Sequence, residues 1–306
     1  MTAGKMHADE IEVDAALVRR LVADQFPQWA RLSIVRVESA GTDNAIFRLG
    51  DELAIRLPRR PSSAPQIEKE QRWLPVLAPQ LPLPIPAPIA RGEPAPDFPW
   101  RWSVYRWLDG ENAFQRDVGA SRDAALAVAQ FVTALQRIEA RDGPPAGAAN
   151  FYRGSPLVQR DAYVRRALAT LTDELDVAAV ARSWDTALAA PPWHDAPTWV
   201  HGDLAAGNLL VRDGRVCAVI DFGCLGVGDP ACDLMVAWNL FVGPAREAFR
   251  TALGPDEAAW ARGRGWALSM AVIAWPYYRD TNPALVAQSR RTIAAVLSES
   301  DRSAVR

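Results

Sequence analysis

The sequence predicts an α+β protein of two lobes: a small lobe that is mainly antiparallel β with one helix, and a larger lobe that is mainly α-helical. Short segments of alternating hydrophobicity gather within the first 107 residues around a helical segment. Helical periodicity dominates the rest of the chain, which holds only a small β insert. The turn Leu108-Asp-Gly110 falls between the two patterns, so we expect lobes of residues 1–107 and 108–306.

In the first lobe, apolar residues recur at helical spacing over residues 65–77, where Pro75 should end or kink the helix. A further helix is expected over 13–26, ahead of the strands. Residues 79–88 alternate proline with apolar residues and should run extended. Strands are predicted over residues 32–39, 45–49, 53–57 and 100–107.

In the second lobe, helices are predicted over 121–137 and 157–188, and most of 233–298 is helical in pattern. Strand-like segments return only at 198–200, 209–211 and 216–220. Asp213-Gly214 lies between the last two and is a strong hairpin signal.

Composition narrows the class of protein. The formal net charge of -2 argues against a nucleic-acid binder that works by bulk electrostatics. The polar, acidic N-terminus has no apolar h-region, and no apolar run reaches the roughly 18 residues of a membrane span. The three cysteines fit no metal-binding spacing and suit a reducing compartment. We therefore expect a cytoplasmic protein that binds neither nucleic acid nor membrane.

The segments that carry chemistry are His201-Gly-Asp-Leu-Ala-Ala-Gly-Asn208 and Val219-Ile-Asp-Phe-Gly223. Phosphoryl transfer needs a carboxylate facing the acceptor hydroxyl and oxygen ligands that hold Mg²⁺ over the phosphates. A hairpin at Asp213-Gly214 would bring Asn208 and Asp221 to the same end of two paired strands. The polar groups of Asp203, Asn208 and Asp221 would then converge on one site.

This pattern resembles the aminoglycoside phosphotransferase family, which has a protein-kinase-like fold. The chain has the family's H-G-D-x-x-x-x-N, I-D-F/W-x and G-D-P-x-x-D motifs, the last as Gly228-Asp-Pro-Ala-Cys-Asp233. The resemblance implies that Asp203 is the catalytic base, that Asn208 and Asp221 bind Mg²⁺, and that ATP or GTP is the phosphate donor. It also implies that Asp233 braces the catalytic loop and that Asp229 shapes its own segment. For His201 we expect a ring that orients the loop and does not transfer protons.

The resemblance places the nucleotide in the first lobe. Gly41, Thr42 and Asn44 take the place of the loop over the phosphates, where their backbone or side chains could face oxygens, although the same residues also suit a plain β-turn. Arg56 takes the strand position of the phosphate-contacting lysine of protein kinases, and a guanidinium is bulkier and differently shaped. Its partner would be Glu70, with Glu68 as the competing choice and a solvated charged face as the alternative to both.

By position, residues 105–108 form the hinge that would meet the purine. We expect backbone contacts from Arg106 and Leu108, with Tyr105 bordering the base; the choice between ATP and GTP stays open.

The acceptor is less defined. Between residues 234 and 306 there are six acidic residues and nine arginines, with frequent aromatics, which suits a less cationic acceptor than an aminoglycoside, such as a macrolide-like compound. Three functions stay open: an antibiotic O-phosphotransferase, a metabolic kinase acting on choline, homoserine or a sugar, and a nucleotide-binding pseudokinase. The intact Asp203, Asn208 and Asp221 oppose the pseudokinase, and Arg56 is the feature that favours it.

Overall fold

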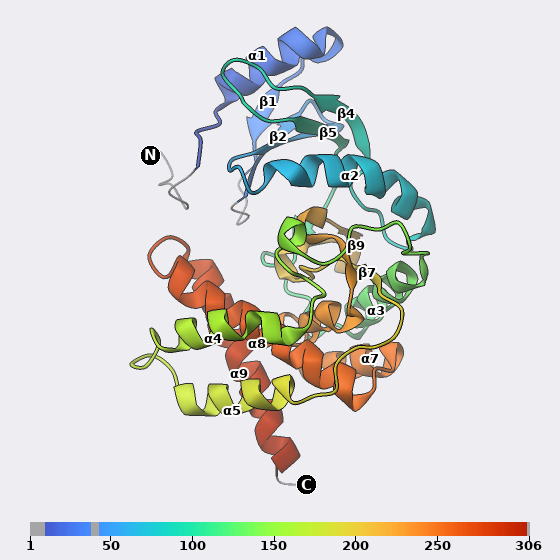
Figure 1. The fold of residues 1–306 in the computed structure, drawn as a ribbon. Helices are drawn as coiled ribbons and strands as arrows, with labels where there is room; N and C mark the ends of the chain where they lie inside the picture. Colours follow the sequence, from blue (N-terminus) through green and yellow to red (C-terminus); the bar gives the residue numbers. More distant parts are fainter. Residues whose placement is uncertain (1–9, 38–42, 305–306) are drawn as a thin grey trace.

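The computed structural model describes residues 10–37 and 43–304, which form a smaller lobe built on a β-sheet and a larger helical lobe (Figure 1). The predicted α+β, two-lobed architecture is confirmed. The sheet of the smaller lobe is antiparallel, with the strand order β1-β2-β3-β5-β4. Its strands are β1 (Ile34–Arg36), β2 (Asn44–Leu49), β3 (Leu53–Pro58), β4 (Pro88–Gly92) and β5 (Trp102–Arg106).

Two helices cover this sheet. Helix α1 (Ala15–Gln25) begins where the Asp14 carboxylate accepts from the N–H of Leu17 at 2.7 Å, and it packs on the face that carries buried Phe47. Helix α2 (Ala64–Leu77) lies along the other face, where Gln71 Nε2 donates to Ser103 Oγ at 2.8 Å. Strand side chains alternate between the two faces of the sheet. The face of β3 and β5 that carries α2 is also the face turned toward the larger lobe (Figure 1).

Two expectations for this lobe need correction. Helix α2 does not end at Pro75 but continues to Leu77, because proline removes one backbone bond while Leu74 and Leu77 stay buried. The expected extended run over 79–88 is wrong at its start, where Ala78–Gln80 form a 3₁₀ turn, and strand β4, which begins at Pro88, was not predicted. Pro88 can open this strand because β4 is the outermost strand of the sheet, where a missing N–H is tolerated.

The larger lobe packs its helices around one apolar core. Helix α8 is at its centre: it packs along α9 and against α5, and the indole of Trp266 is fully buried. The helices are α3 (Arg122–Arg137), α4 (Asp161–Leu168), α5 (Val177–Leu188), α6 (Val236–Asn239), α7 (Gly243–Leu253), α8 (Glu257–Tyr278) and α9 (Pro283–Ala304). The predicted helix over 157–188 is thus two helices, because Asp176 caps a new start by accepting from Ala179 N at 2.9 Å.

Short strands of this lobe position the catalytic segments. β6 (Glu111–Asn112), β8 (Leu209–Arg212) and β9 (Arg215–Val219) form one sheet, and β7 (Thr198–Val200) pairs with β10 (Gly226–Gly228). Asp213 and Gly214 both have positive φ, 53° and 74°, as a tight hairpin turn requires. The predicted hairpin is confirmed.

The packing of Gly92 against Trp102 gives a test of the first lobe. A Cβ at Gly92 would lie 1.9 Å from Trp102 Cε2, and this indole is fully buried. We expect Gly92→Ala to lower the free energy of unfolding by about 1–3 kcal/mol, because the core would be overpacked. Urea unfolding measures this. Gly147→Ala is the matched control, since an added Cβ there would lie 3.9 Å from the nearest atom. Equal free energies of unfolding for the two variants would contradict the packing of Gly92 against Trp102.

Candidate active site

The catalytic loop begins directly after β7 and is held by a buried carboxylate. Asp233, on the 3₁₀ turn Pro230–Met235, accepts from the backbone N–H of His201 and of Gly202, each at 2.8 Å. Burial raises the pKa of Asp233, and the bonds from these two N–H groups and the nearby His201 ring act against that rise. The fully buried carboxyl group therefore fixes the start of the loop.

The ring of His201 connects the loop to the strand that precedes Asp221. Its Nδ1 accepts from the N–H of Asp203 at 3.2 Å, so the proton lies on Nε2, which donates to Ile220 O at 3.1 Å. Both ring nitrogens are thus engaged by the backbone, and the ring is fully buried. This geometry matches the orienting role expected for His201.

The side chains of Asp203, Asn208 and Asp221 come together at the end of the β8–β9 hairpin. Asn208 Nδ2 donates to Asp203 O at 2.8 Å and to Asp203 Oδ2 at 3.0 Å. Ile220 N donates to Asn208 O at 2.9 Å, which places Asp221 beside Asn208. Asp221 adopts a left-handed conformation, with φ 63° and ψ 74°, and 42% of its side chain is exposed.

This arrangement leaves oxygens free for a cation. Asn208 uses its amide nitrogen on Asp203, so its amide oxygen is available, and Asp221 bonds Arg56 through Oδ1 alone. Within the described ranges, no three His, Cys, Asp or Glu side chains cluster as a metal site. Two protein oxygens suit Mg²⁺, which usually takes its other ligands from phosphates and water.

Arg56 joins the two lobes at this point. From β3 its Nη1 donates to Glu70 Oε1 on α2 at 2.5 Å, and its Nη2 donates to Asp221 Oδ1 at 2.8 Å. Of the two partners that the sequence left open, Glu70 lies against Arg56, while Glu68 points outward to Arg101. Burial opposes the charge on Arg56, but Glu70 and Asp221 outweigh it and raise its pKa. Likewise desolvation acts to raise the pKa of Asp221, and Arg56 and His201 hold it below its usual value.

The other residues expected at the nucleotide lie around this ion pair. The Tyr105 hydroxyl donates to Glu70 Oε2 at 2.5 Å, so this buried side chain supports the pair. With its amide oxygen turned to Arg56, Asn44 accepts from Nε at 3.1 Å and from Nη2 at 2.9 Å. Gly41 and Thr42 lie outside the described residues.

At the hinge, Arg106 donates its N–H to Ala87 O at 2.9 Å, so its carbonyl is the backbone group left for a purine. In the described part of the chain, the N–H of Leu108 has no backbone partner. Arg106 is the last residue of β5 and Leu108 lies two residues after it, where the chain leaves the sheet of the smaller lobe.

Asp229 lies apart from the reacting groups. It is buried and paired with Arg262 on α8, whose Nε donates to Asp229 Oδ2 at 2.7 Å. It also accepts from the N–H of Ala231 at 3.0 Å. Its contacts fit the shaping role expected for it, since the pair ties the segment after β10 to α8.

Three side chains near the site were missed from the sequence. Gln66 Oε1 accepts from Arg56 Nη2 at 3.2 Å, and Lys69 Nζ donates to Gly223 O at 2.7 Å. Arg153 Nη2 lies 3.7 Å from Asp203 Oδ1. The sequence could have indicated Gln66 and Lys69, because they share the predicted helix α2 with Glu70. Arg153 comes from a loop, and no pattern in the sequence points to it.

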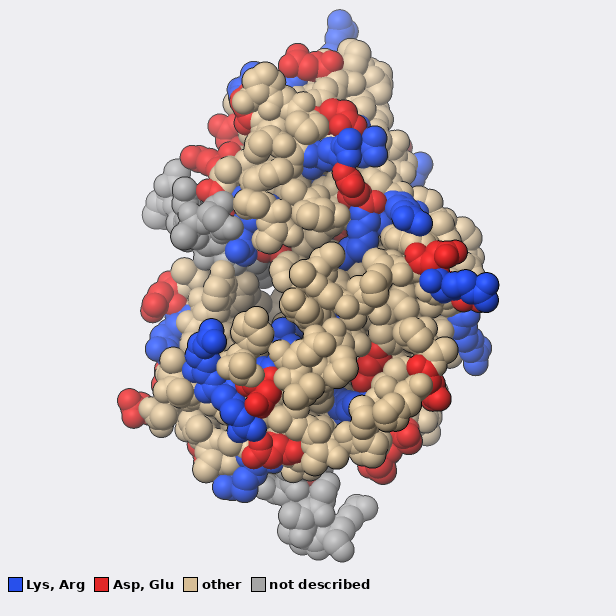
Figure 2. Space-filling view, in the orientation of Figure 1, with Lys and Arg blue, Asp and Glu red and all other residues tan. Residues whose placement is uncertain are grey.

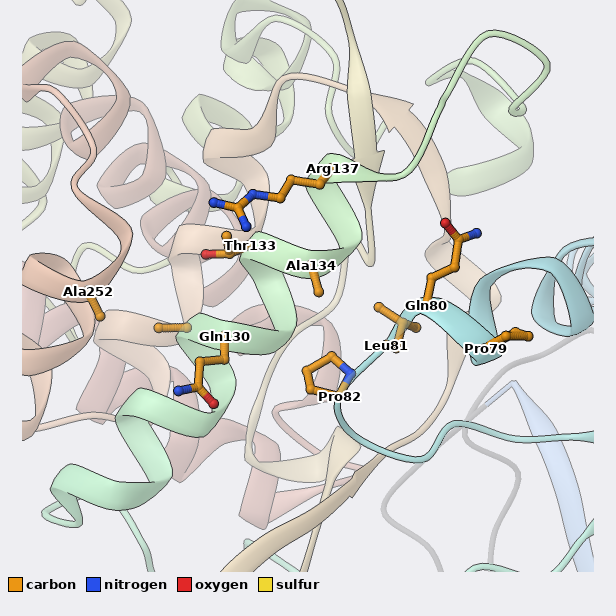
Figure 3. A pocket seen from close by; sticks show the side chains of 10 residues that line it. Pro79, Gln80, Leu81, Pro82, Gln130, Thr133, Ala134, Arg137 and Ala252 are labelled. Atoms are coloured by element: carbon orange, nitrogen blue, oxygen red, sulfur yellow. The ribbon is translucent and has the colours of Figure 1, made fainter.

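A groove of about 560 Å³ lies elsewhere, between the chain after α2 and the helices α3 and α7 (Figure 3). Leu81 and Pro82 form one wall, and Thr133 and Arg137 come from α3. None of the residues expected in the site lines it, so it is separate from the site.

Comparison with known proteins identifies the family. The model of the phosphotransferase enzyme family matches residues 34–266, and the chain belongs to this family. An aminoglycoside 3'-phosphotransferase of Escherichia coli is 38% identical over 56 residues, which are 18% of this chain and 21% of that protein. The match thus spans about a fifth of that relative's length.

Solved structures confirm the two-lobed, protein-kinase-like fold. The GDP complex of an aminoglycoside 2'-phosphotransferase superposes with a TM-score of 0.72 at 16% identity, covering 94% of this chain and all of that one (100%). The macrolide 2'-phosphotransferase of Brachybacterium faecium superposes with a TM-score of 0.61 at 24% identity, covering 92% of this chain and 97% of that one. In the part of the chain that the structure describes, every helix is too short or too polar to cross a bilayer.

The buried pair of Arg56 and Glu70 predicts a stability effect. Their side chains are 9% and 1% exposed, so Arg56→Met would leave a buried carboxylate without its cation. We expect a loss of about 3–5 kcal/mol in the free energy of unfolding, measured in urea. Arg101→Met, which removes the exposed partner of Glu68, is the control and should cost less than about 1 kcal/mol. Similar losses in both variants would show that the buried pair is not special.

Proposed function

We propose that this protein is a nucleotide-dependent O-phosphotransferase that moves the γ-phosphate of ATP or GTP to a hydroxyl group of a small molecule. The observation that carries the proposal is the convergence of Asp203, Asn208 and Asp221 beneath Arg56. The Asp203 carboxylate is held by Asn208, and 36% of its side chain stays exposed toward an acceptor. Within the described residues, one oxygen of Asn208 and one of Asp221 are open to a cation, and the Arg56 guanidinium lies beside Asp221. Phosphoryl transfer needs these parts and little covalent chemistry.

In this mechanism Asp203 accepts the proton of the acceptor hydroxyl. Asn208 holds the carboxylate through Oδ2, and His201 holds the backbone of Asp203 through its N–H. Bound Mg²⁺, held by Asn208 and Asp221, would neutralise charge on the phosphates. Arg56 holds Asp221 in place, and its guanidinium can contact a phosphate.

The nucleotide would occupy the cleft between residues 1–107 and 108–306, with the purine at the hinge. In this proposal Tyr105, whose hydroxyl bonds Glu70, would border the base, and the Arg106 carbonyl and the Leu108 N–H would contact it. The loop over the phosphates would be formed by Gly41, Thr42 and Asn44. Relatives support a nucleotide donor, because solved structures of this fold are described as GDP and ATP complexes.

For the acceptor, relatives support an antibiotic of the aminoglycoside or macrolide type, since both kinds of phosphotransferase share the fold. A metabolic kinase acting on choline, homoserine or a sugar is the second candidate. The excess of arginine over acidic residues after residue 234 disfavours a polycationic aminoglycoside and suits a less cationic acceptor. Lysine, arginine, aspartate and glutamate are interspersed on the face in Figure 2 and form no single basic field, which supports a small-molecule partner in place of a nucleic acid. The composition suits the cytoplasm, and this compartment belongs to the same proposal.

The role of Asp203 can be tested by substitution. We expect Asp203→Ala to lower phosphate transfer by about 10²-fold or more while nucleotide still binds, because the carboxylate acts on the acceptor. A coupled nucleotide-turnover assay across aminoglycosides, macrolides, choline and homoserine, with ATP and with GTP, measures this. Exposed Asp195→Ala is the control. Loss of nucleotide binding together with activity would make Asp203 a structural residue, and nucleotide binding by wild type without turnover of any acceptor would favour a pseudokinase.

The role of Asp221 gives a separate prediction. Removing its carboxylate should abolish the Mg²⁺ dependence of nucleotide binding, so that Asp221→Ala binds nucleotide equally weakly with Mg²⁺ and with EDTA. Wild type should bind about tenfold or more tightly with Mg²⁺ than with EDTA. Calorimetric titration of ATP and of GTP measures the difference. A variant that keeps the wild-type response to EDTA would contradict the metal role.

A further inference from the structure

Two arginines that the proposed mechanism does not use meet near Asp203: Arg153 lies beside its carboxylate, and Arg160 meets Arg153 at Met270. Arg153 is 7% exposed and packs its Cβ against Gly202, where an added Cβ would lie 2.9 Å away. Arg160, just before α4, is half-buried, and both guanidiniums contact Met270 Sδ on α8, Arg160 at 3.7 Å. The two cations therefore meet at one place, on a thioether that is a weak acceptor.

The positive charge at this place is poorly balanced. Asp203 is the carboxylate that faces Arg153, at 3.7 Å, and among the described residues Arg160 has no ion pair with a carboxylate. The neighbouring thiols do not compensate, since burial raises the pKa of Cys224 to about 12 and that of Cys232 well above its usual value. Burial and the charge of Arg153 lower the pKa of Arg160 to about 10. The Nε atoms of Arg153 and Arg160 are both buried without a hydrogen-bond partner.

The position of this pair distinguishes it from the nucleotide site. Asp203 turns Oδ2 to Asn208, on the side expected to hold the metal and phosphates, and turns Oδ1 to Arg153. From Arg153 the pair continues to Met270 and α4, away from Asn208. A group bound there would reach Asp203 from the side on which the acceptor must lie.

We propose that Arg153 and Arg160 form an oxyanion subsite that binds a carboxylate or phosphate group of the acceptor next to its reacting hydroxyl. The proposal rests on the proposed function, because it takes Asp203 as the residue that faces the acceptor. A buried and a half-buried guanidinium, each with an Nε that has no partner among the described residues, attract an oxyanion and repel ammonium groups. The subsite therefore selects anionic or zwitterionic hydroxy compounds and disfavours polycationic aminoglycosides.

Inorganic phosphate is the probe for this subsite. Wild-type protein is first saturated with Mg²⁺ and a non-hydrolysable ATP or GTP analogue, whichever binds, and phosphate is then titrated by calorimetry. We expect Arg153→Met and Arg160→Met to weaken phosphate binding by about tenfold or more, since each removes a charged donor. Arg165→Met is the matched control on α4, because Arg165 is exposed and already pairs with Asp161 and Asp185, and its affinity should equal that of wild type.

The outcomes separate the sources of the anion. Phosphate binding that the nucleotide analogue abolishes would place the anion at the nucleotide phosphates and overturn the proposal. Equal phosphate affinities of wild type and Arg160→Met would also overturn the proposal. Arg160→Met keeps the packing of Arg153, so it remains the test if Arg153→Met fails to fold. Binding needs no turnover, so a subsite that binds phosphate in a protein inactive on every acceptor would refute the proposed function and leave the subsite standing.

A kinetic comparison tests the selectivity. Where an aminoglycoside is turned over, Arg160→Met should lower its KM by a few fold, because a repelling charge is removed, with kcat changed less. For an acceptor that carries a carboxylate or phosphate the KM should instead rise. Opposite shifts would contradict the proposed subsite.

Discussion

The buried guanidinium of Arg56 is the contact on which the arrangement of the candidate site depends. It belongs to the central region of the first sheet, bonds Glu70 on α2 and reaches Asp221 after β9. One side chain thus connects sheet, helix and catalytic hairpin. The buried charge of Arg56 is balanced by the carboxylates of Glu70 and Asp221. The positions of the sheet, α2 and the hairpin therefore depend on one another.

A second buried charge fixes the catalytic loop in the same way. Asp233 accepts two backbone N–H groups at the start of the loop, and the His201 ring joins the loop to Ile220. The side chains of the candidate site are thereby held by buried groups outside it. A family whose chemistry is mainly positioning needs this kind of support, since small displacements of the carboxylate or the metal ligands are costly in rate.

The surroundings of Asp203 differ on its two sides. On one side Asp203 accepts from the amide nitrogen of Asn208, whereas on the other it faces the guanidinium of Arg153, whose Nε has no hydrogen-bond partner among the described residues. Relatives of the same fold include enzymes described as acting on aminoglycosides and on macrolides. Because the fold is shared while the acceptor differs, local charge beside the catalytic carboxylate is a better guide to this acceptor than the fold.

The sequence by itself determined the reaction motifs and the hairpin that brings them together. The segment from His201 to Asn208, the turn Asp213-Gly214 and Asp221 lie within about twenty residues, so turn chemistry and strand pairing bring them to one end of a hairpin. Arg56 and Asp233 then fix the side chain of Asp221 and the start of the loop. Most helices and strands were likewise predictable, because their hydrophobic periods are local. Strands β4, β6 and β10 were not predicted. Pro88 of β4 suits a strand only at the edge of a sheet, and edge position is a property of the whole sheet. Strands β6 and β10 have two and three residues, too few to show a period.

Tertiary structure decided which charges meet. Glu68 and Glu70 are two residues apart on α2 and so point about 200° apart around the helix, and only the docking of α2 onto the sheet turns Glu70 toward Arg56. Arg153 reaches Asp203 across fifty residues of sequence through a loop packed on Gly202. Local sequence patterns predict helices, strands and turns from neighbouring residues. The pairing of buried charges depends on how distant elements pack, and no local pattern predicts that packing.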